Sequence, residues 1–203
     1  MSALPPILDW MNHHGMKIFT HGEFNLNIFG IRMHPGKVNE FDDLLGVAYR
    51  EMGSWVVRYW PITTDPGLYW LENPMNVDGT AILVPGQYRG AWGLGRHRGR
   101  YDALVQRKPV KVYRDRDGDG FINTDADSIQ KGMFGINIHR AKQGASSSAV
   151  NKWSAGCQVF ARAADFDEFM FLVGQSAPLY GSTFTYTLLE SFGGVIGSLH
   201  DSP

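Results

Sequence analysis

The sequence predicts a mainly β fold with one or two helices, packed as one sizeable domain. Aromatic residues make up 13% of the 203 residues, and 24 glycines with 10 prolines provide many turns. Short runs of alternating apolar and polar residues recur along the chain, whereas only one long segment has strong helical spacing of its apolar residues. Together these features favour short strands joined by turns over a helical bundle.

The residue pattern divides the chain into three parts. Residues 1–40 form a lead-in segment of unknown role, with a short helix expected over residues 7–14 and strand-like alternation over residues 17–31. Residues 41–190 form the main domain. Residues 191–203 are rich in Gly and Ser, and we expect them to form a flexible tail.

The main domain opens with a predicted hairpin. Residues 44–50 and 54–60 read as two strands joined at Glu51-Met52-Gly53. Residues 61–67 then carry the Pro, Asp and Gly residues that are typical of turns. Further short strands are expected over residues 80–84, 103–106, 110–113 and 133–139.

A C-terminal helix and a final strand complete the predicted fold. Asp165 can cap the helix, with Glu168 at the spacing of a capping box. Apolar residues at i, i+3, i+4 and i+7 then form a buried stripe, consisting of Phe166, Phe169, Met170 and Val173. Residues 182–190 alternate threonines with large apolar residues, which indicates a half-buried strand.

Composition and charge exclude several classes of function. Nineteen Lys and Arg residues against twenty Asp and Glu residues give a net charge of -1, so we expect no nucleic-acid partner. No apolar run approaches the ~20 residues of a membrane span. No secretory signal is visible, so we expect synthesis in the cytoplasm. Cys157 is the only cysteine, which excludes an intramolecular disulfide and a Cys-rich zinc site.

The stretch from Gly135 to Cys157 carries the clearest chemistry. In a strand, Ile136 and Ile138 would face the core, and Asn137 and His139 would share the opposite face. A polar surface loop can then return the chain so that Cys157 meets His139. An adjacent imidazole can lower a thiol pKa from about 8.5 to between about 3.5 and 7.5, and can later protonate a leaving amine. A single cysteine is, however, more often a small buried apolar residue.

This stretch resembles a known family signature. His139, fourteen intervening residues and then Ser154-x-Gly156-Cys157 are similar to the motif of the L,D-transpeptidase (YkuD-like) catalytic domain. The hairpin over residues 44–60, the turn after it and the strand after the C-terminal helix also fit that family, so the resemblance covers roughly residues 42–190. It implies a YkuD-like mixed β-sandwich or barrel. The local sequence also resembles bacteriophage proteins of this type.

The resemblance implies roles for individual residues. Cys157 would be the nucleophile and His139 the base, with the Arg140 carbonyl orienting the imidazole. The N–H groups of Gly156 and Cys157 would form the oxyanion hole, within a motif that begins at Ser154. Two departures affect the acceptor step: the family's second His is Ala155 here, and Gln158-Val159 displace its Asn or Arg. The family needs no metal for catalysis.

The expected function is cysteine-dependent acyl transfer on peptidoglycan stem peptides, either transpeptidation or hydrolysis. The enzyme would reach the wall after lysis or as part of a particle. The alternative is a non-catalytic wall-binding or virion structural module on the same fold.

Several residues are candidates for substrate binding. Asn137 would share the face of His139, and Trp153 could line a sugar or peptide groove. Arg96 and His97 belong to the chain's one basic concentration, over residues 89–108, which could attract the carboxylates of stem peptides or form an ordinary solvated face.

An acidic segment has the spacing of a calcium loop. Side-chain oxygens recur at positions 1, 3, 5 and 9 with glycine at position 6, and the candidate ligands are Asp115, Asp117, Asp119, Asn123 and Asp125. The acid expected at position 12 is replaced by Ala126. The site would be structural, and the alternative is an Asp/Gly-rich hairpin turn.

Overall fold

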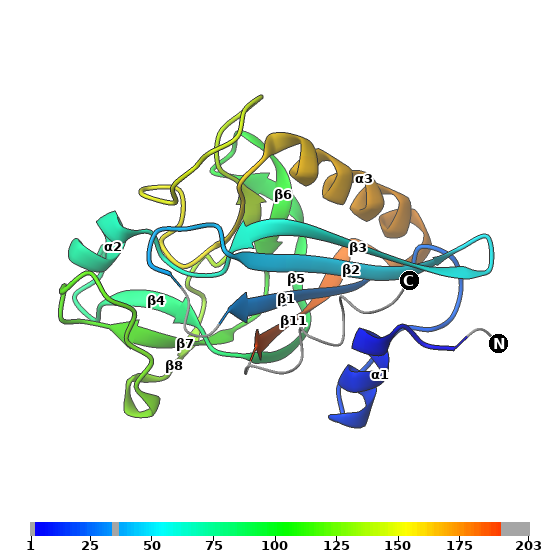
Figure 1. The fold of residues 1–203 in the computed structure, drawn as a ribbon, viewed down its shortest axis with the longest axis horizontal. Helices are drawn as coiled ribbons and strands as arrows, with labels where there is room; N and C mark the ends of the chain where they lie inside the picture. Colours follow the sequence, from blue (N-terminus) through cyan, green and yellow to red (C-terminus); the bar gives the residue numbers. More distant parts are fainter. Residues whose placement is uncertain (1–2, 34–36, 192–203) are drawn as a thin grey trace.

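The structure, a computed structural model, describes residues 3–33 and 37–191. It confirms the mainly β fold: a closed eight-stranded barrel carries a separate three-stranded sheet at one end (Figure 1). The predicted C-terminal helix and final strand are also confirmed, as α3 (Ala163–Tyr180) and β11 (Thr183–Ser191). The tail predicted over residues 191–203 lies outside the described residues except for Ser191, which ends β11.

The barrel runs in the order β1-β11-β5-β6-β9-β10-β3-β2. Two neighbouring pairs are parallel, β1 with β11 and β9 with β10, and the other pairs are antiparallel. Besides β11, its strands are β1 (Asn27–Met33), β2 (Asp43–Glu51), β3 (Ser54–Thr63), β5 (Gly86–His97), β6 (Tyr101–Gln106), β9 (Ile138–Arg140) and β10 (Gln158–Phe160).

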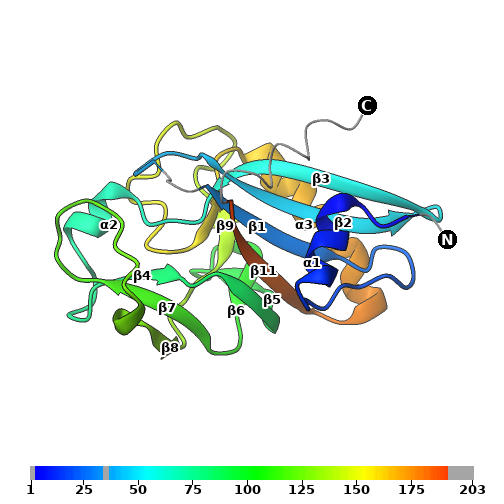
Figure 2. The same cartoon turned by 60° about the horizontal axis from the view of Figure 1, so that its bottom comes forward.

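The N-terminal segment is part of the barrel rather than a separate lead-in. Strand β1 lies between β2 and β11 and pairs with both. The predicted short helix is confirmed as α1 (Pro6–His13), which packs against this part of the barrel wall (Figure 2). The strand expected from residue 17 begins only at Asn27, because the chain turns at Gly22 and Phe24, both at positive φ. The boundary expected near residue 40 therefore does not divide the fold.

The hairpin of β2 and β3 is confirmed and extends beyond its predicted ends. Glu51 pairs with Ser54, so Met52 and Gly53 form a two-residue turn. Both turn residues have positive φ, 48° and 76° respectively. This is the type I′ geometry, whose twist matches that of the two strands.

Helix α3 confirms the predicted apolar stripe but not the predicted cap. The helix begins at Ala163 with Arg162 at the N-cap and no capping side chain. Asp165 lies inside the first turn, with its Oδ1 3.4 Å from the Arg162 guanidinium, so the capping-box prediction was wrong. Phe166, Phe169 and Val173 are buried in the main core, and Met170 packs against it.

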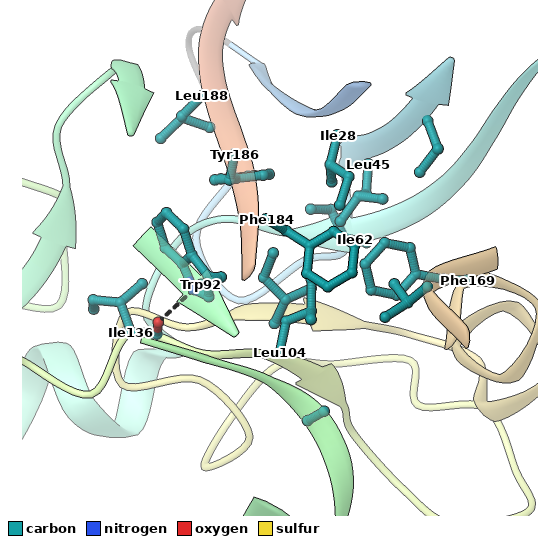
Figure 3. Packing of buried hydrophobic residues seen from close by; sticks show 14 of the residues in the cluster. Ile28, Leu45, Ile62, Trp92, Leu104, Ile136, Phe169, Phe184, Tyr186 and Leu188 are labelled. Carbon is teal, nitrogen blue, oxygen red and sulfur yellow. Dashed lines mark hydrogen bonds between the residues drawn. The ribbon is translucent and has the colours of Figure 1, made fainter. Parts of the chain in front are cut away.

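The interior of the barrel is filled by aromatic and branched side chains from most of its strands (Figure 3). Trp92 and Tyr186 lie edge to face with their ring centroids 5.2 Å apart. Their polar atoms are satisfied: Trp92 Nε1 donates to the Ile136 carbonyl at 2.8 Å, and the Tyr186 hydroxyl donates to Gln158 Oε1 at 2.7 Å. These two hydrogen bonds tie the core to Ile136, three residues before His139, and to Gln158, the residue after Cys157.

The smaller sheet has the order β4-β7-β8. It consists of β4 (Thr80–Leu83), β7 (Val110–Asp115) and β8 (Gln130–Gly132), flanked by α2 (Leu68–Glu72) and the 3-10 turn η1 (Ala126–Ser128). The prediction of a single strand over residues 133–139 was wrong. Regular strand pairing resumes only at Ile138, and Gly135 has a φ of +72°. Within the described ranges, no helix has the length and apolar character needed to cross a membrane.

Candidate functional site

The topology brings Cys157 and His139 onto adjacent parallel strands. Strand β10 pairs with β9 so that Val159 lies opposite His139, and Cys157 directly precedes β10. The Gln158 N–H donates to the Asn137 carbonyl at 2.9 Å, which holds the start of the two strands together. As predicted from alternation, Ile136 and Ile138 are buried in the core, which leaves the other face of the strand to Asn137 and His139.

The Cys157 thiol is held by the backbone of the segment before β9. Sγ donates to the Gly135 carbonyl at 3.5 Å and accepts from the Asn137 N–H at 3.4 Å. In the described part of the chain, no hydrogen bond joins the thiol to His139. Burial raises the pKa of Cys157 to about 11, although the Asn137 N–H and Arg98 act in the opposite direction. The lowered thiol pKa expected from the sequence is therefore not found, although Cys157 as a residue is only partly buried.

The His139 imidazole has a defined tautomer. Its Nδ1 lies 2.9 Å from the carbonyl oxygen of Arg140, which can only accept, so Nδ1 carries the proton. The Tyr101 hydroxyl donates to the same carbonyl at 3.2 Å. Burial, followed by the neighbouring His97, lowers the pKa of His139 to about 3. The ring is therefore neutral, with the basic lone pair on Nε2.

A second imidazole and an amide complete this cluster. The rings of His97 and His139 are stacked with centroids 3.9 Å apart. Asn137 accepts from the Gln106 N–H at 3.0 Å, so its Nδ2 is the atom that donates to His97 Nδ1 at 3.2 Å. Burial, followed by Arg98 and Arg100, lowers the pKa of His97 to about 4. Of the two residues expected to bind substrate, His97 thus stacks on His139 and Asn137 contacts His97.

The turn before Cys157 is built around Ser154 and Gly156. The buried Ser154 hydroxyl donates to the Cys157 carbonyl at 2.8 Å and accepts from the Gly156 N–H at 3.2 Å. Gly156 has a φ of +110°, and a Cβ there would lie 2.0 Å from the Ala81 carbonyl oxygen. Only glycine fits this position. Because Ser154 takes the Gly156 N–H, the Cys157 N–H is the donor that can face a developing oxyanion.

A cleft of about 410 Å³ reaches the turn before Cys157 at Ala155, but neither Cys157 nor His139 lines it. It is bordered by Ala155, two residues before the cysteine, and by Met133 and Phe134, which precede Gly135. Arg114 also lines it, with its guanidinium carbon 4.7 Å from the centre of the Phe134 ring. Arg114 was not predicted as a site residue from the sequence. Val110, Val112 and Arg114 share one face of β7, and a charged residue at the end of an apolar stripe could have indicated a functional position.

Two other predicted binding residues lie outside this cleft. Arg96 is exposed on β5 and donates to the Arg100 carbonyl at 2.7 Å. Trp153 is 40% exposed and lies in the loop between β9 and β10. Neither residue lines the hollow beside Ala155.

The predicted calcium ligands lie in the segment that follows β7. Among the described residues, no group of three or more His, Cys, Asp and Glu side chains lies in positions that could hold a metal ion. Asp115 ends β7 and is buried, whereas Asp117 and Asp119 are exposed in the following turn.

Compared with protein-family models, with curated proteins and with solved structures, the chain matches none of them.

Proposed function

We propose that this chain is a cysteine-dependent acyl-transfer enzyme that acts on peptidoglycan stem peptides. The observation that carries the proposal is the placement of Cys157 directly before β10 and of His139 on the adjacent parallel strand β9, with the cysteine turn reaching a cleft of about 410 Å³ at Ala155. The Arg140 carbonyl fixes the imidazole in the tautomer that a general base needs.

The pKa values favour general-base attack over a preformed thiolate–imidazolium pair. With the thiol protonated and the ring neutral, His139 Nε2 would take the thiol proton as Sγ attacks the scissile carbonyl carbon. The new C–S bond places the displaced electron pair on the carbonyl oxygen, where the Cys157 N–H can stabilise it. As the C–N bond breaks, the imidazolium returns the proton to the leaving amine.

An acyl-thioester remains on Cys157 after this step. Attack by water releases a carboxylic acid, whereas attack by an amine forms a new amide; either restores the thiol. His139 would take the proton from the attacking group and return it to the sulfur. Because Ala155 stands where the resembled family has a second histidine, we propose water as the acceptor, which makes the enzyme a peptidase.

The cleft suits a peptide that carries free carboxylates. Trp70, Met133 and Phe134 supply apolar surface, and Arg114 supplies positive charge close to the cysteine turn. Arg114 already donates to the Gly79 carbonyl and to Gln130, so it is held in a fixed position. A stem peptide offers both methyl groups and carboxylates to such a surface. This chemical match and the motif resemblance of His139 and Cys157 together support a stem-peptide substrate.

The test is mass spectrometry of purified muropeptides after incubation with the protein. We expect cleavage products from the wild type and none from Cys157→Ala or His139→Ala. His13→Ala, an exposed histidine change in α1, is the matched control and should retain activity. Melting curves would verify that each variant is folded. Undiminished turnover by Cys157→Ala would remove the nucleophile assignment.

A second candidate is a non-catalytic wall-binding module on the same fold. The observation that favours it is that the hydrogen-bond partners of the Cys157 thiol are backbone groups rather than His139. This candidate predicts that wild type and Cys157→Ala sediment equally with purified peptidoglycan and that neither releases products. Any product whose formation requires Cys157 would exclude it.

A further inference from the structure

We propose that the loop from Asp115 to Asp125 is a calcium site that braces the smaller sheet beside the cleft. The loop follows β7 directly, and its first candidate ligand is the last residue of that strand. This site is independent of the proposed peptidase chemistry.

The loop backbone adopts the turns that such a site requires. Gly118 and Gly120 have φ values of +70° and +81°, which reverse the chain between the acidic residues. Asn123 closes the loop, since its N–H donates to Asp115 Oδ2 at 2.9 Å and its Nδ2 donates to Asp117 Oδ2 at 2.8 Å. The first and ninth positions of the motif are therefore already in contact.

The buried carboxylate of Asp115 is the observation that points to a ligand. Asp115 is 1% exposed, and its Oδ1 is buried without a hydrogen-bond partner. A buried carboxylate oxygen without a hydrogen-bond partner is costly unless a cation neutralises it.

The neighbouring arginines do not fill this role. Arg114 donates to the Gly79 carbonyl and to Gln130 Oε1, both at 2.9 Å, and Arg116 donates to the Asp78 carbonyl at 3.1 Å. Across residues 3–33 and 37–191, neither arginine forms an ion pair with a carboxylate of the loop. Arg114 and Arg116 therefore line a hollow beside the loop without pairing with the carboxylates of the loop.

The ligands available favour calcium over a smaller or softer cation. All are oxygens: the carboxylates of Asp115, Asp117 and Asp119, the Asn123 side chain and the carbonyls of the loop. This hollow of about 250 Å³ is lined by Asp117, Asn123, Asp125, Asp127 and Ser128, together with Arg114 and Arg116. Asp125 and Asp127 can complete the set directly or through water. Calcium accepts six to eight such oxygens in irregular geometry, whereas magnesium demands a strict octahedron.

Binding would require only side-chain rotation. Asp117 Oδ1 accepts the Asp119 N–H at 3.3 Å, and Asp119 Oδ1 accepts the Phe121 N–H at 2.8 Å. Both residues are exposed, so their carboxylates can turn toward Asp115 without disturbing the core.

The loop is linked to the cleft through the strand pairing of the smaller sheet. Asp115 pairs with Thr80 of β4, and the next residue of β4 is Ala81, whose carbonyl contacts Gly156. A Cβ at Gly79 would lie 2.0 Å from the Asp115 carbonyl oxygen, so the two segments are in close contact. A cation that fixes Asp115 would therefore also stiffen one wall of the cleft.

The experiment is calorimetric titration of the EDTA-treated full chain with calcium chloride, followed by thermal melting. At a calcium concentration about 100 times the Kd, the melting temperature should rise by about 5–10 °C. Asp119→Asn should weaken binding at least tenfold and remove the rise. Asp167→Asn, an exposed change on α3, should leave both unchanged. These results together would support the site.

Three outcomes would overturn it. Absence of both binding heat and thermal shift would exclude a calcium site. A shift of equal size in Asp119→Asn would place the cation elsewhere on the molecule. An equal response to magnesium chloride would contradict the choice of cation. Since Asp119→Asn changes an exposed side chain, its circular dichroism in EDTA should match that of the wild type, which separates lost binding from misfolding.

Discussion

Burial keeps the Cys157 sulfur protonated, against the opposing effects of the Asn137 N–H and Arg98. Because its pKa is about 11 in the folded chain, iodoacetamide alkylation should be slow at neutral pH and should accelerate about tenfold per pH unit as pH rises toward 11. Mass spectrometry of the modified chain across a pH series would measure this rate. Rapid alkylation well below pH 8 would show instead that the thiol is activated in the resting protein.

The same thiol affects the pH dependence of stability. A folded-state pKa above the ordinary value of about 8.5 means that the folded chain holds this proton more tightly than the unfolded chain does. The stabilisation is complete below pH 8.5 and is lost as pH rises from there toward 11. Urea unfolding of wild type and Cys157→Ala should therefore diverge in this alkaline range. Parallel stability curves would contradict the prediction.

His97 influences the imidazole against which it stacks. Because His97 lowers the pKa of His139, His97→Phe should keep an aromatic ring against His139 and raise that pKa toward its ordinary value. Proton NMR of the His139 ring during a pH titration would measure the change. Turnover should also fall, since Asn137 Nδ2 loses its acceptor. An unchanged His139 titration would show that stacking has no electrostatic effect.

At the scale of the element, the turn that leads into β10 depends on a glycine. Gly156→Ala would combine strain at a φ of +110° with a close contact to the Ala81 carbonyl. We expect a loss of about 2–5 kcal/mol in the free energy of unfolding, measured by urea denaturation.

Gly174→Ala is the matched control for this change. Gly174 lies in α3, and a Cβ there meets no atom within 4 Å. Alanine should raise stability by about 0.5–1 kcal/mol because it favours the helix. A similar effect of both substitutions would contradict the strain assigned to Gly156.

For the whole molecule, one buried arginine joins the barrel to the smaller sheet. Arg32 of β1 donates to the Leu83 carbonyl of β4 at 3.0 Å and forms an ion pair with buried Asp65 at 2.9 Å. Arg32→Met would leave the Asp65 carboxylate without its counterion, at a cost of about 3–5 kcal/mol. Arg89→Met, on an exposed position of β5, should change stability by less than about 0.5 kcal/mol. Denaturant midpoints would measure both; equal midpoints would contradict this role of Arg32.

Local sequence patterns predicted those parts of the fold whose conformation depends on residues close together in the sequence. The hairpin over Met52 and Gly53, the stripe of α3 and the core positions of Ile136 and Ile138 all follow from short-range periodicity. Strand β5 was missed because its glycines interrupt the apolar alternation, and its hydrogen bonds come from β6 and β11. Pairing partners of this kind are set by tertiary packing.

The candidate site was predicted in its residues but not in its electrostatics. The spacing of His139 and Cys157 selected both residues, and alternation placed Asn137 beside His139. The protonated thiol could not be foreseen, because it depends on burial and on contacts with Gly135 and Asn137. The stacking of His97 on His139 likewise depends on the barrel bringing β5 close to β9 through β6.

Because β1 pairs with β11, the barrel can close only once the C-terminal strand is available. During synthesis on the ribosome, β1 emerges long before β11, and until then it can pair only with β2. One of its edges must wait unpaired, in reach of other nascent chains. A chain that stops before residue 183 would lack the strand that joins β1 to β5, and would therefore leave two open edges prone to aggregation.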